Sequence, residues 1–212
     1  MDLTVKTSRS SYKVTANGLT LTVSRGNMKT GRIMALSLPP IQSCIDNPPC
    51  AKTCYAMKAI RLYPNCRKAW GDNLRLWDQN VNDFLLSLHA ILKKTRPTFF
   101  RWHVAGDIVS PRYLAMMRII AELHPKTKFL AFTKRYEYDY SDLPENLCIV
   151  FSAWPGLDMP SVKGISVAYM RDEKDLDKRI PDDALECPGN CETCGACWGL
   201  SKKGIDVAFN KH

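Results

Sequence analysis

Residues 99–133, FFRWHVAGDIVSPRYLAMMRIIAELHPKTKFLAFT, carry the pattern on which the fold prediction depends. The expected order is a strand, a helix and a strand, over 99–105, 111–123 and 129–133. Ser110 is suited to cap the helix, and Pro111 to occupy its first position, where a missing N–H loses no helical partner. This order predicts a βαβ unit with parallel strands and a right-handed crossover.

The flanking sequence adds a hairpin, more strands and a long helix. Residues 12–24 predict a β-hairpin with a tight turn at Asn17-Gly18, because both positions tolerate positive φ. Apolar residues spaced by three and four over 67–94 predict one long helix. The remaining expected strands are 32–38, 148–152 and 165–170.

The connections between the later strands limit the architecture. Stretches 134–147 and 153–164 are too short and too rich in Pro, Gly and Asp for full helices. The predicted fold class is therefore α/β, an incomplete (β/α) barrel or a curved, mostly parallel sheet with an N-terminal β-hairpin. Residues 1–180 would form this domain, and 181–212 a Cys-rich C-terminal segment packed on it.

Composition restricts the class of protein. With 45% hydrophobic residues in 212, the chain is long enough to bury a core without disulfide staples. Its first residues lack the apolar region of a signal peptide, and no apolar run approaches the roughly 20 residues of a membrane helix. We therefore expect no membrane partner and a cytoplasmic location.

Eight of the nine cysteines fall into two groups. The groups are Cys44, Cys50, Cys54 and Cys66, and then Cys187, Cys191, Cys194 and Cys197. Such thiols can form disulfides, bind a metal or pack as small apolar groups. In reducing cytosol, clustered cysteines are more often metal ligands than bridges, so metal binding is the favoured interpretation.

The second group has the more specific spacing. Cys191, Cys194 and Cys197 form a compact C-x₂-C-x₂-C run, which resembles the bacterial ferredoxin motif, and Cys187 is followed by proline, as the remaining ferredoxin ligand is. Structural zinc sites usually separate two C-x₂-C pairs by a longer loop. The sequence favours a [4Fe-4S] cluster over zinc, which stays the alternative, and Cys187 could instead reach the first group.

The first group resembles part of the radical SAM motif. Cys50-x₃-Cys54 matches its first two cysteines, but Met57 occupies the third place, so Cys44 is the substitute ligand. Further along, Ala105-Gly106-Asp107 looks like a shortened form of that family's Gly-Gly-Glu motif. The resemblance implies a radical-SAM-like core in which Cys44, Cys50 and Cys54 hold a cluster with one iron open to S-adenosylmethionine (SAM). The cofactor-binding candidates are Tyr55, His103, Gly106 and Asp107.

A wider match covers residues 26 to 198 and resembles the phage gene eighty-eight product family. It is carried by Asn27-Met28-Lys29-Thr30-Gly31, Cys50…Cys54-Tyr55-Ala56, Tyr63-Pro64-Asn65, His103-Val104-Ala105-Gly106-Asp107 and the final Cys-x₂-Cys-Gly-x-Cys. The resemblance implies an iron–sulfur protein with no settled activity, located in the host cytoplasm. Cys66 is not a fixed element of that family and is left out of the ligand set.

Net charge supports a second hypothesis of a different class. With 30 basic and 21 acidic residues, the formal charge is +9, which suits acidic partners such as nucleic acid. In that case the iron–sulfur or zinc centre would be purely structural. The aromatic residues expected to stack on bases, beside Lys134 and Arg135, are Trp102, Tyr136, Tyr138 and Tyr140. A small-molecule partner is the expectation of the first hypothesis.

Overall fold

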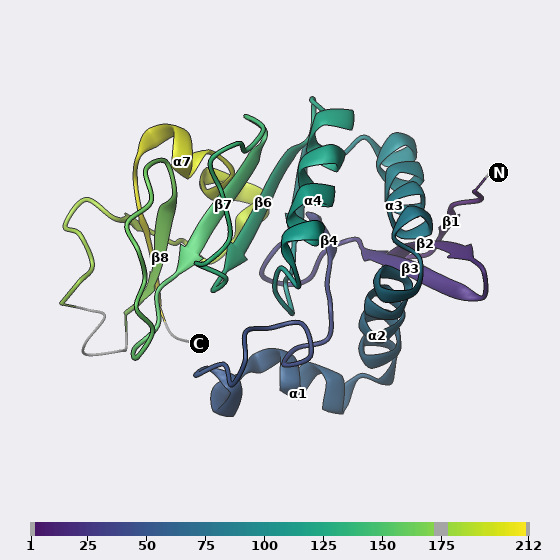
Figure 1. Ribbon diagram of the computed structural model, residues 1–212, viewed down its shortest axis with the longest axis horizontal. Coiled ribbons are helices and arrows are strands. Elements are labelled where there is room, and N and C mark those ends of the chain that lie inside the picture. The colour runs from purple at the N-terminus through teal and green to yellow at the C-terminus, as the bar shows by residue number, and fades with distance from the viewer. Residues whose placement is uncertain (1–2, 172–177, 211–212) are drawn as a thin grey trace.

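A ten-stranded sheet organises the protein in the computed structural model, which describes residues 3–171 and 178–210 (Figure 1). The strands, in spatial order, are β1 (Lys6–Thr7), β2 (Ser11–Ala16), β3 (Leu19–Ser24), β4 (Met34–Leu36), β5 (Phe99–Trp102), β6 (Lys128–Thr133), β7 (Leu147–Ser152), β8 (Ser166–Met170), β10 (Val207–Phe209) and β9 (Leu185–Glu186). Pairing is antiparallel from β1 to β4 and parallel from β4 to β9. The sheet is mostly parallel, as predicted, and it stays open because β1 and β9 are its two edges.

Local sequence features explain the hairpin and the βαβ unit. Asn17 and Gly18 both adopt positive φ, 48° and 80°, and join β2 to β3 in a tight turn. β5 and β6 are parallel neighbours connected through α4 (Pro111–Leu123). The Ser110 hydroxyl accepts a hydrogen bond of 3.2 Å from the Tyr113 N–H, which confirms its predicted capping role.

The single long helix predicted over 67–94 is wrong. The structure has two helices, α2 (Pro64–Gln79) and α3 (Val81–Thr95), which meet at Asn80. Asn80 is extended, with φ −153° and ψ 90°, and its side chain accepts a hydrogen bond from the Asp83 N–H at 3.0 Å. An asparagine side chain competes with the helical backbone in this way and starts a new helix instead of continuing the old one.

Replacing Asn80 with alanine is expected to lower the free energy of unfolding by about 1 kcal/mol, because the Asp83 N–H loses its cap. Asn82→Ala is the matched control, since Asn82 is exposed on the first turn of the same helix. Urea unfolding followed by circular dichroism measures both. Equal midpoints for the two variants would contradict a capping role.

The first cysteine segment contains a short helix that its sequence did not indicate. The chain forms η1 (Ala51–Thr53) and then α1 (Tyr55–Leu62) before α2 begins at Pro64. Ala56 is the buried residue of α1, so little of this helix packs against the core. The sequence therefore carries no long apolar stripe from which the helix could be predicted.

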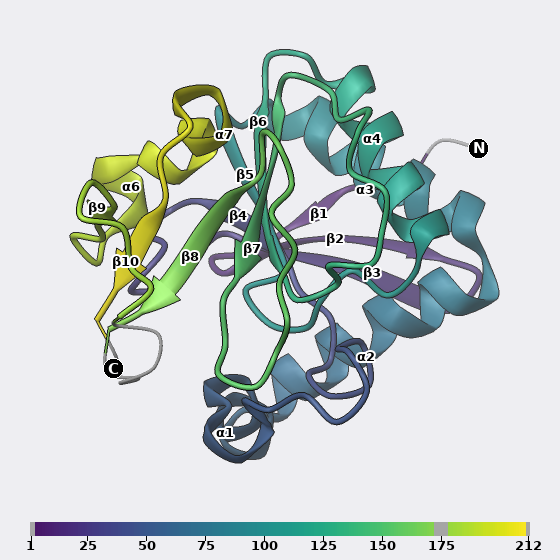
Figure 2. The ribbon, with the colours of Figure 1, turned by 60° about the vertical axis from the view of Figure 1, so that its left-hand side comes forward.

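Different layers cover the two faces of the sheet. On one face, α2, α3 and α4 pack a large aromatic core that includes Phe84, Trp102 and Tyr113. On the other face, the C-terminal segment packs Trp198 and Leu200. This segment contains α6 (Cys191–Cys194), η2 (Ala196–Gly199), α7 (Leu200–Lys203) and β10. Figure 2 shows it in yellow, across the sheet from α3 and α4.

The C-terminal segment is also part of the sheet. β10 pairs in parallel with β8 on one side and with β9 on the other. The Trp198 Nε1–H donates a hydrogen bond of 3.0 Å to the Phe100 carbonyl of β5, which holds the segment against the sheet. Among the described residues, no helix is long and apolar enough to span a bilayer.

Candidate metal centres and the adjoining polar network

The first cysteine group lies beyond the carboxyl end of β4. Cys50 precedes η1, and Cys54 separates η1 from α1, so the two short helices fix their spacing. Burial, with smaller effects of the charges of Asp107, Cys50 and Cys54, raises the pKa of the Cys44 thiol to about 11, although a hydrogen bond with the Ile41 backbone opposes the rise. Cys44, Cys50 and Cys54 are therefore neighbours in the fold, beside the loop that follows β5.

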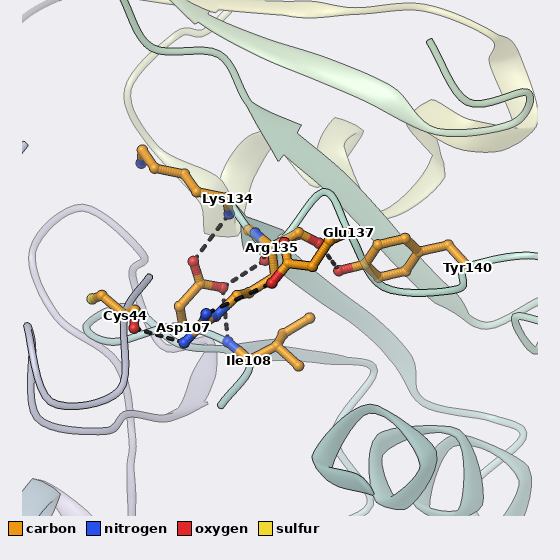
Figure 3. A network of polar contacts seen from close by, with 8 residues as sticks. Cys44, Asp107, Ile108, Lys134, Arg135, Glu137 and Tyr140 are labelled. Atoms are coloured by element: carbon orange, nitrogen blue, oxygen red, sulfur yellow. Dashed lines mark hydrogen bonds and ion pairs between the residues drawn. The ribbon is translucent and has the colours of Figure 1, made fainter. Parts of the chain in front are cut away.

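Asp107 is the centre of a buried polar network at this edge of the sheet (Figure 3). One carboxylate oxygen accepts hydrogen bonds from the Ile108 N–H at 2.7 Å and from the Thr133 hydroxyl at 2.6 Å. The other oxygen accepts from the Lys134 N–H at 3.0 Å. Burial raises the pKa of Asp107, while these three hydrogen bonds oppose the rise. Its carboxylate ties the loop after β5 to the end of β6.

Arg135 connects this network to the first cysteine group. Its guanidinium donates a hydrogen bond of 2.7 Å to the Cys44 carbonyl and lies 3.6 Å from the Glu137 carboxylate. The Tyr140 hydroxyl donates to the Arg135 carbonyl at 2.6 Å. With 18% of its side chain exposed, Arg135 is a structural tie in this network.

Gly106 allows the loop after β5 to approach the cysteine segment closely. A Cβ at this position would lie 2.4 Å from the Ser43 hydroxyl and 2.9 Å from the Leu38 carbonyl oxygen. Its φ of +86° also excludes most other residues. The Asp107 N–H faces the same Ser43 hydroxyl at 3.4 Å. Gly106 and Asp107, both cofactor-binding candidates, thus pack against the segment that leads to Cys44.

His103 and Tyr55, the other two candidates, have contrasting surroundings. His103 is 4% exposed, adopts a φ of 56°, and its Nε2 lies 3.1 Å from the Tyr113 hydroxyl. Burial, with a smaller effect of Arg101, lowers its pKa to about 3, so the imidazole is neutral at physiological pH. Its Nδ1 has no partner among the described residues. Tyr55 is 63% exposed and directly follows Cys54.

The second cysteine group lies within the C-terminal segment. Cys187 follows β9. Cys191 and Cys194 are the first and last residues of α6, and Cys197 lies in η2. Burial, with smaller effects of the charges of the other three thiols, raises the pKa of Cys197 to about 12, and the charge of Arg101 opposes the rise. The four cysteines of this group therefore lie in one segment, near enough for the charges of three of them to act on Cys197. Every one of the nine cysteines is a free thiol.

The two groups lie toward opposite ends of β4. The Cys191 N–H donates to the Lys29 carbonyl at 3.1 Å, just before β4, whereas Cys44 follows that strand. Cys187, which could have reached the first group, instead affects the pKa values of Cys191 and Cys197. Within residues 3–171 and 178–210, no three Cys, His, Asp or Glu side chains converge on a point suited to a metal ion.

Two aromatic residues expected to stack on bases are placed elsewhere. Trp102 is fully buried in the helix-covered core, and Tyr140 is 5% exposed, so neither ring faces a ligand. The Tyr138 ring lies 5.9 Å from the Arg135 guanidinium, and Tyr136 donates its hydroxyl to the Ser152 carbonyl. The sequence pattern could not distinguish these cases, because strand ends and loops both carry aromatic residues here.

Arg101 is the residue of interest that sequence reasoning missed. It lies in β5, within the apolar run FFRWHVA. Burial raises the pKa values of Cys191 and Cys197 and lowers that of His103; the charge of Arg101 opposes the first two shifts and adds to the third. The signal available in the sequence was a lone charged residue in an otherwise apolar strand.

Comparison with known proteins identifies the family. The sequence model described as "Gene product 88" matches residues 6–200. The "Gene 88 protein" of Mycobacterium phage L5 is 28% identical, with 81% of this chain and 85% of the relative aligned. The "Gene 88 protein" of Mycobacterium phage D29 shows the same identity and coverage. No solved structure matches significantly. With this pattern of cysteines, this sheet and a match over nearly its whole length, the chain belongs to the Gene product 88 family, whose relatives named here are phage proteins.

Proposed function

We propose that this protein binds an iron–sulfur centre through Cys187, Cys191, Cys194 and Cys197. The observation that carries the proposal is that Cys187, Cys191 and Cys197 pack against one apolar cluster, and that Cys194 ends the short helix α6, which begins at Cys191. Thiolates are the donors that iron–sulfur clusters take, and the compact C-x₂-C-x₂-C run is their usual arrangement. All four thiols are free to serve as ligands.

The fold of the C-terminal segment suits this role. Gly195 follows α6 with a φ of 62°, which lets the chain turn back between Cys194 and Cys197. Cys187, Cys191 and Cys197 pack against the apolar cluster under the segment, which would limit water around a bound centre. When bound, such a centre supplies one-electron transfer.

The proposal extends to a second centre at Cys44, Cys50 and Cys54. Its support is the position of these three thiols beyond β4, around the short helix η1, as in radical SAM enzymes, to which the chain has a resemblance. Three protein ligands leave one iron for a small molecule, and SAM is the proposed occupant. Asp107 would act there by bracing the loop, because its oxygens already accept three hydrogen bonds.

Iron and acid-labile sulfide, measured after anaerobic purification, test the proposal. Two centres predict about eight irons per chain, and a single centre about four, with matching sulfide. A brown colour with charge-transfer absorption should accompany the iron. A colourless protein that contains zinc and no sulfide would contradict the proposal. Cleavage of SAM to 5′-deoxyadenosine by the reduced protein tests the second centre separately.

A further inference from the structure

The elbow between α1 and α2 concentrates the positive charge of the chain. Residues 47–77 contain six basic residues and one acidic residue, so this stretch supplies five of the nine net positive charges. The basic residues are Lys52, Lys58, Arg61, Arg67, Lys68 and Arg75, and the acidic residue is Asp72. α1 lies at the margin of the molecule in both views, where its outer side chains meet solvent (Figures 1 and 2).

Most of this charge is not neutralised by neighbouring carboxylates. Lys58 and Arg61 are exposed, and within residues 3–171 and 178–210 neither belongs to an ion pair. Asp72 pairs with Lys68 at 2.6 Å and also with Arg75, so one carboxylate faces two cations. The surface therefore keeps an excess of positive charge that suits an acidic partner.

Arg67 joins the cations of the two helices into one surface. Its Nε–H donates a hydrogen bond of 3.0 Å to the Ile60 carbonyl, in the last turn of α1. That carbonyl lacks its helical donor, because the residue four positions on is Pro64, which has no N–H. Arg67 therefore lies over the end of α1. We call the resulting group of exposed residues the elbow surface: Lys58, Arg61, Leu62, Tyr63 and Arg67.

An aromatic ring lies among these cations. Tyr63 is 59% exposed, and it connects α1 to α2 in an extended conformation, with φ −123° and ψ 94°. Proteins that bind single-stranded nucleic acid combine a basic surface, which follows the phosphates, with exposed aromatic rings on which the bases stack. The elbow surface provides both elements.

The apolar part of α1 is too small to favour a lipid surface. Basic amphipathic helices that bind membranes insert a broad apolar face between the lipids. In α1, Ala56 is buried and Met57 and Ile60 are half-buried, so Leu62 is the exposed aliphatic residue of this helix. A charged surface with one exposed leucine is better suited to phosphates than to lipid tails.

We propose that the elbow surface binds single-stranded nucleic acid, with Lys58, Arg61 and Arg67 facing phosphates and Tyr63 stacking on a base. The contacts are non-covalent and depend little on base sequence. This inference goes beyond the proposed iron–sulfur protein and does not depend on it, because no residue of the elbow surface is a proposed ligand.

Binding of a fluorescent oligothymidylate of roughly 16 nucleotides, a length typical of single-strand sites, tests the inference. Fluorescence anisotropy gives the affinity at several salt concentrations. Replacing both Lys58 and Arg61 by glutamine is expected to weaken binding about tenfold at about 0.1 M salt. The slope of log affinity against log salt should also fall by about 1.4, because two phosphate contacts are lost.

The matched control replaces Lys93 and Lys126 by glutamine. Both are exposed and lie at the opposite edge of the sheet, just before β5 and β6 begin. This variant loses the same charge and should keep the wild-type affinity and salt slope. Equal weakening by the two double variants would overturn the inference, because net charge would then explain binding without the elbow surface.

A second pair of variants tests stacking without a change of charge. Tyr63→Ala is expected to weaken binding about tenfold, whereas Tyr63→Phe keeps the ring and should bind like the wild type. Equal affinities for Tyr63→Ala and the wild type would contradict the proposal for single strands. If the Lys58 and Arg61 double variant failed to fold in urea unfolding, the Tyr63 pair would decide the question.

Wild-type protein that bound vesicles of phosphatidylserine but not the oligonucleotide would show a lipid partner and end the proposal. Because binding is measured separately from iron and sulfide, that result would leave the proposed function standing. Conversely, a protein without iron that binds the oligonucleotide through the elbow surface would refute the proposed function and support this inference.

Discussion

Replacing Cys197 by serine is expected to remove the centre from the C-terminal segment and to reduce its bound iron by more than about tenfold, since even an indirect contact to a ligand contributes tenfold or more to metal affinity. A serine hydroxyl keeps its proton at neutral pH and is a poor ligand for iron. Cys197 is suited to this test because all three other thiols of its group affect it. Iron, sulfide and visible absorption are measured after anaerobic purification.

Two further serine variants complete the test. Cys66→Ser is the matched control, because burial alone raises the pKa of this thiol in α2 and no other cysteine acts on it. Cys50→Ser should remove the centre of the first group and leave that of the second, so it separates two centres from a shared one. If Cys197→Ser kept as much iron as Cys66→Ser, the C-terminal thiols would not be ligands.

Asp107→Ala is expected to lower the free energy of unfolding by about 3 kcal/mol, because three buried donors lose their acceptor. The loss of stability should exceed that of a typical surface substitution, because the Thr133 hydroxyl and two backbone N–H groups would stay buried without a hydrogen-bond acceptor. Urea unfolding, followed by circular dichroism, measures the difference. Asp107→Asn retains one acceptor oxygen and should recover part of the stability.

Asp158→Ala is the control for this substitution, because Asp158 is an exposed carboxylate in the loop after β7. It should change stability little. If Asp107→Ala and Asp158→Ala unfolded at the same urea concentration, the network would not stabilise the fold. Asp107 would then be better explained as a group reserved for a bound molecule, as the radical SAM resemblance suggested.

Local patterns predicted those parts of the fold whose partners are close in sequence. The hairpin turn at Asn17-Gly18 and the cap at Ser110 each depend on adjacent residues, and both occur in the structure. The break at Asn80 was missed because apolar spacing continues through it, from Trp77 to Phe84. The strands β9 and β10 have two and three residues, too few for a pattern, and form through pairing with β8 and each other.

The candidate site was predictable to the same extent. Spacing alone placed eight cysteines in two groups. In the structure Cys44, Cys50 and Cys54 lie in one segment and Cys187, Cys191, Cys194 and Cys197 in another, whereas Cys66 lies in α2. The role of Asp107 in bracing β6 could not be seen, because its partners Thr133 and Lys134 are 26 and 27 residues away. The position of Arg101 under the C-terminal segment was equally hidden, since it depends on contacts such as that of Trp198, 98 residues from Phe100.

The position of β10 between β8 and β9 has a consequence for protein synthesis. The thiols at 187–197 leave the ribosome before residues 207–209, and within the described part of the chain β9 pairs with β10 alone. For that interval the nascent segment is tethered at one end and open to the surrounding solution. If the proposed centre forms, iron could also reach the folded segment, because Cys194 stays exposed while Cys187, Cys191 and Cys197 are half-buried.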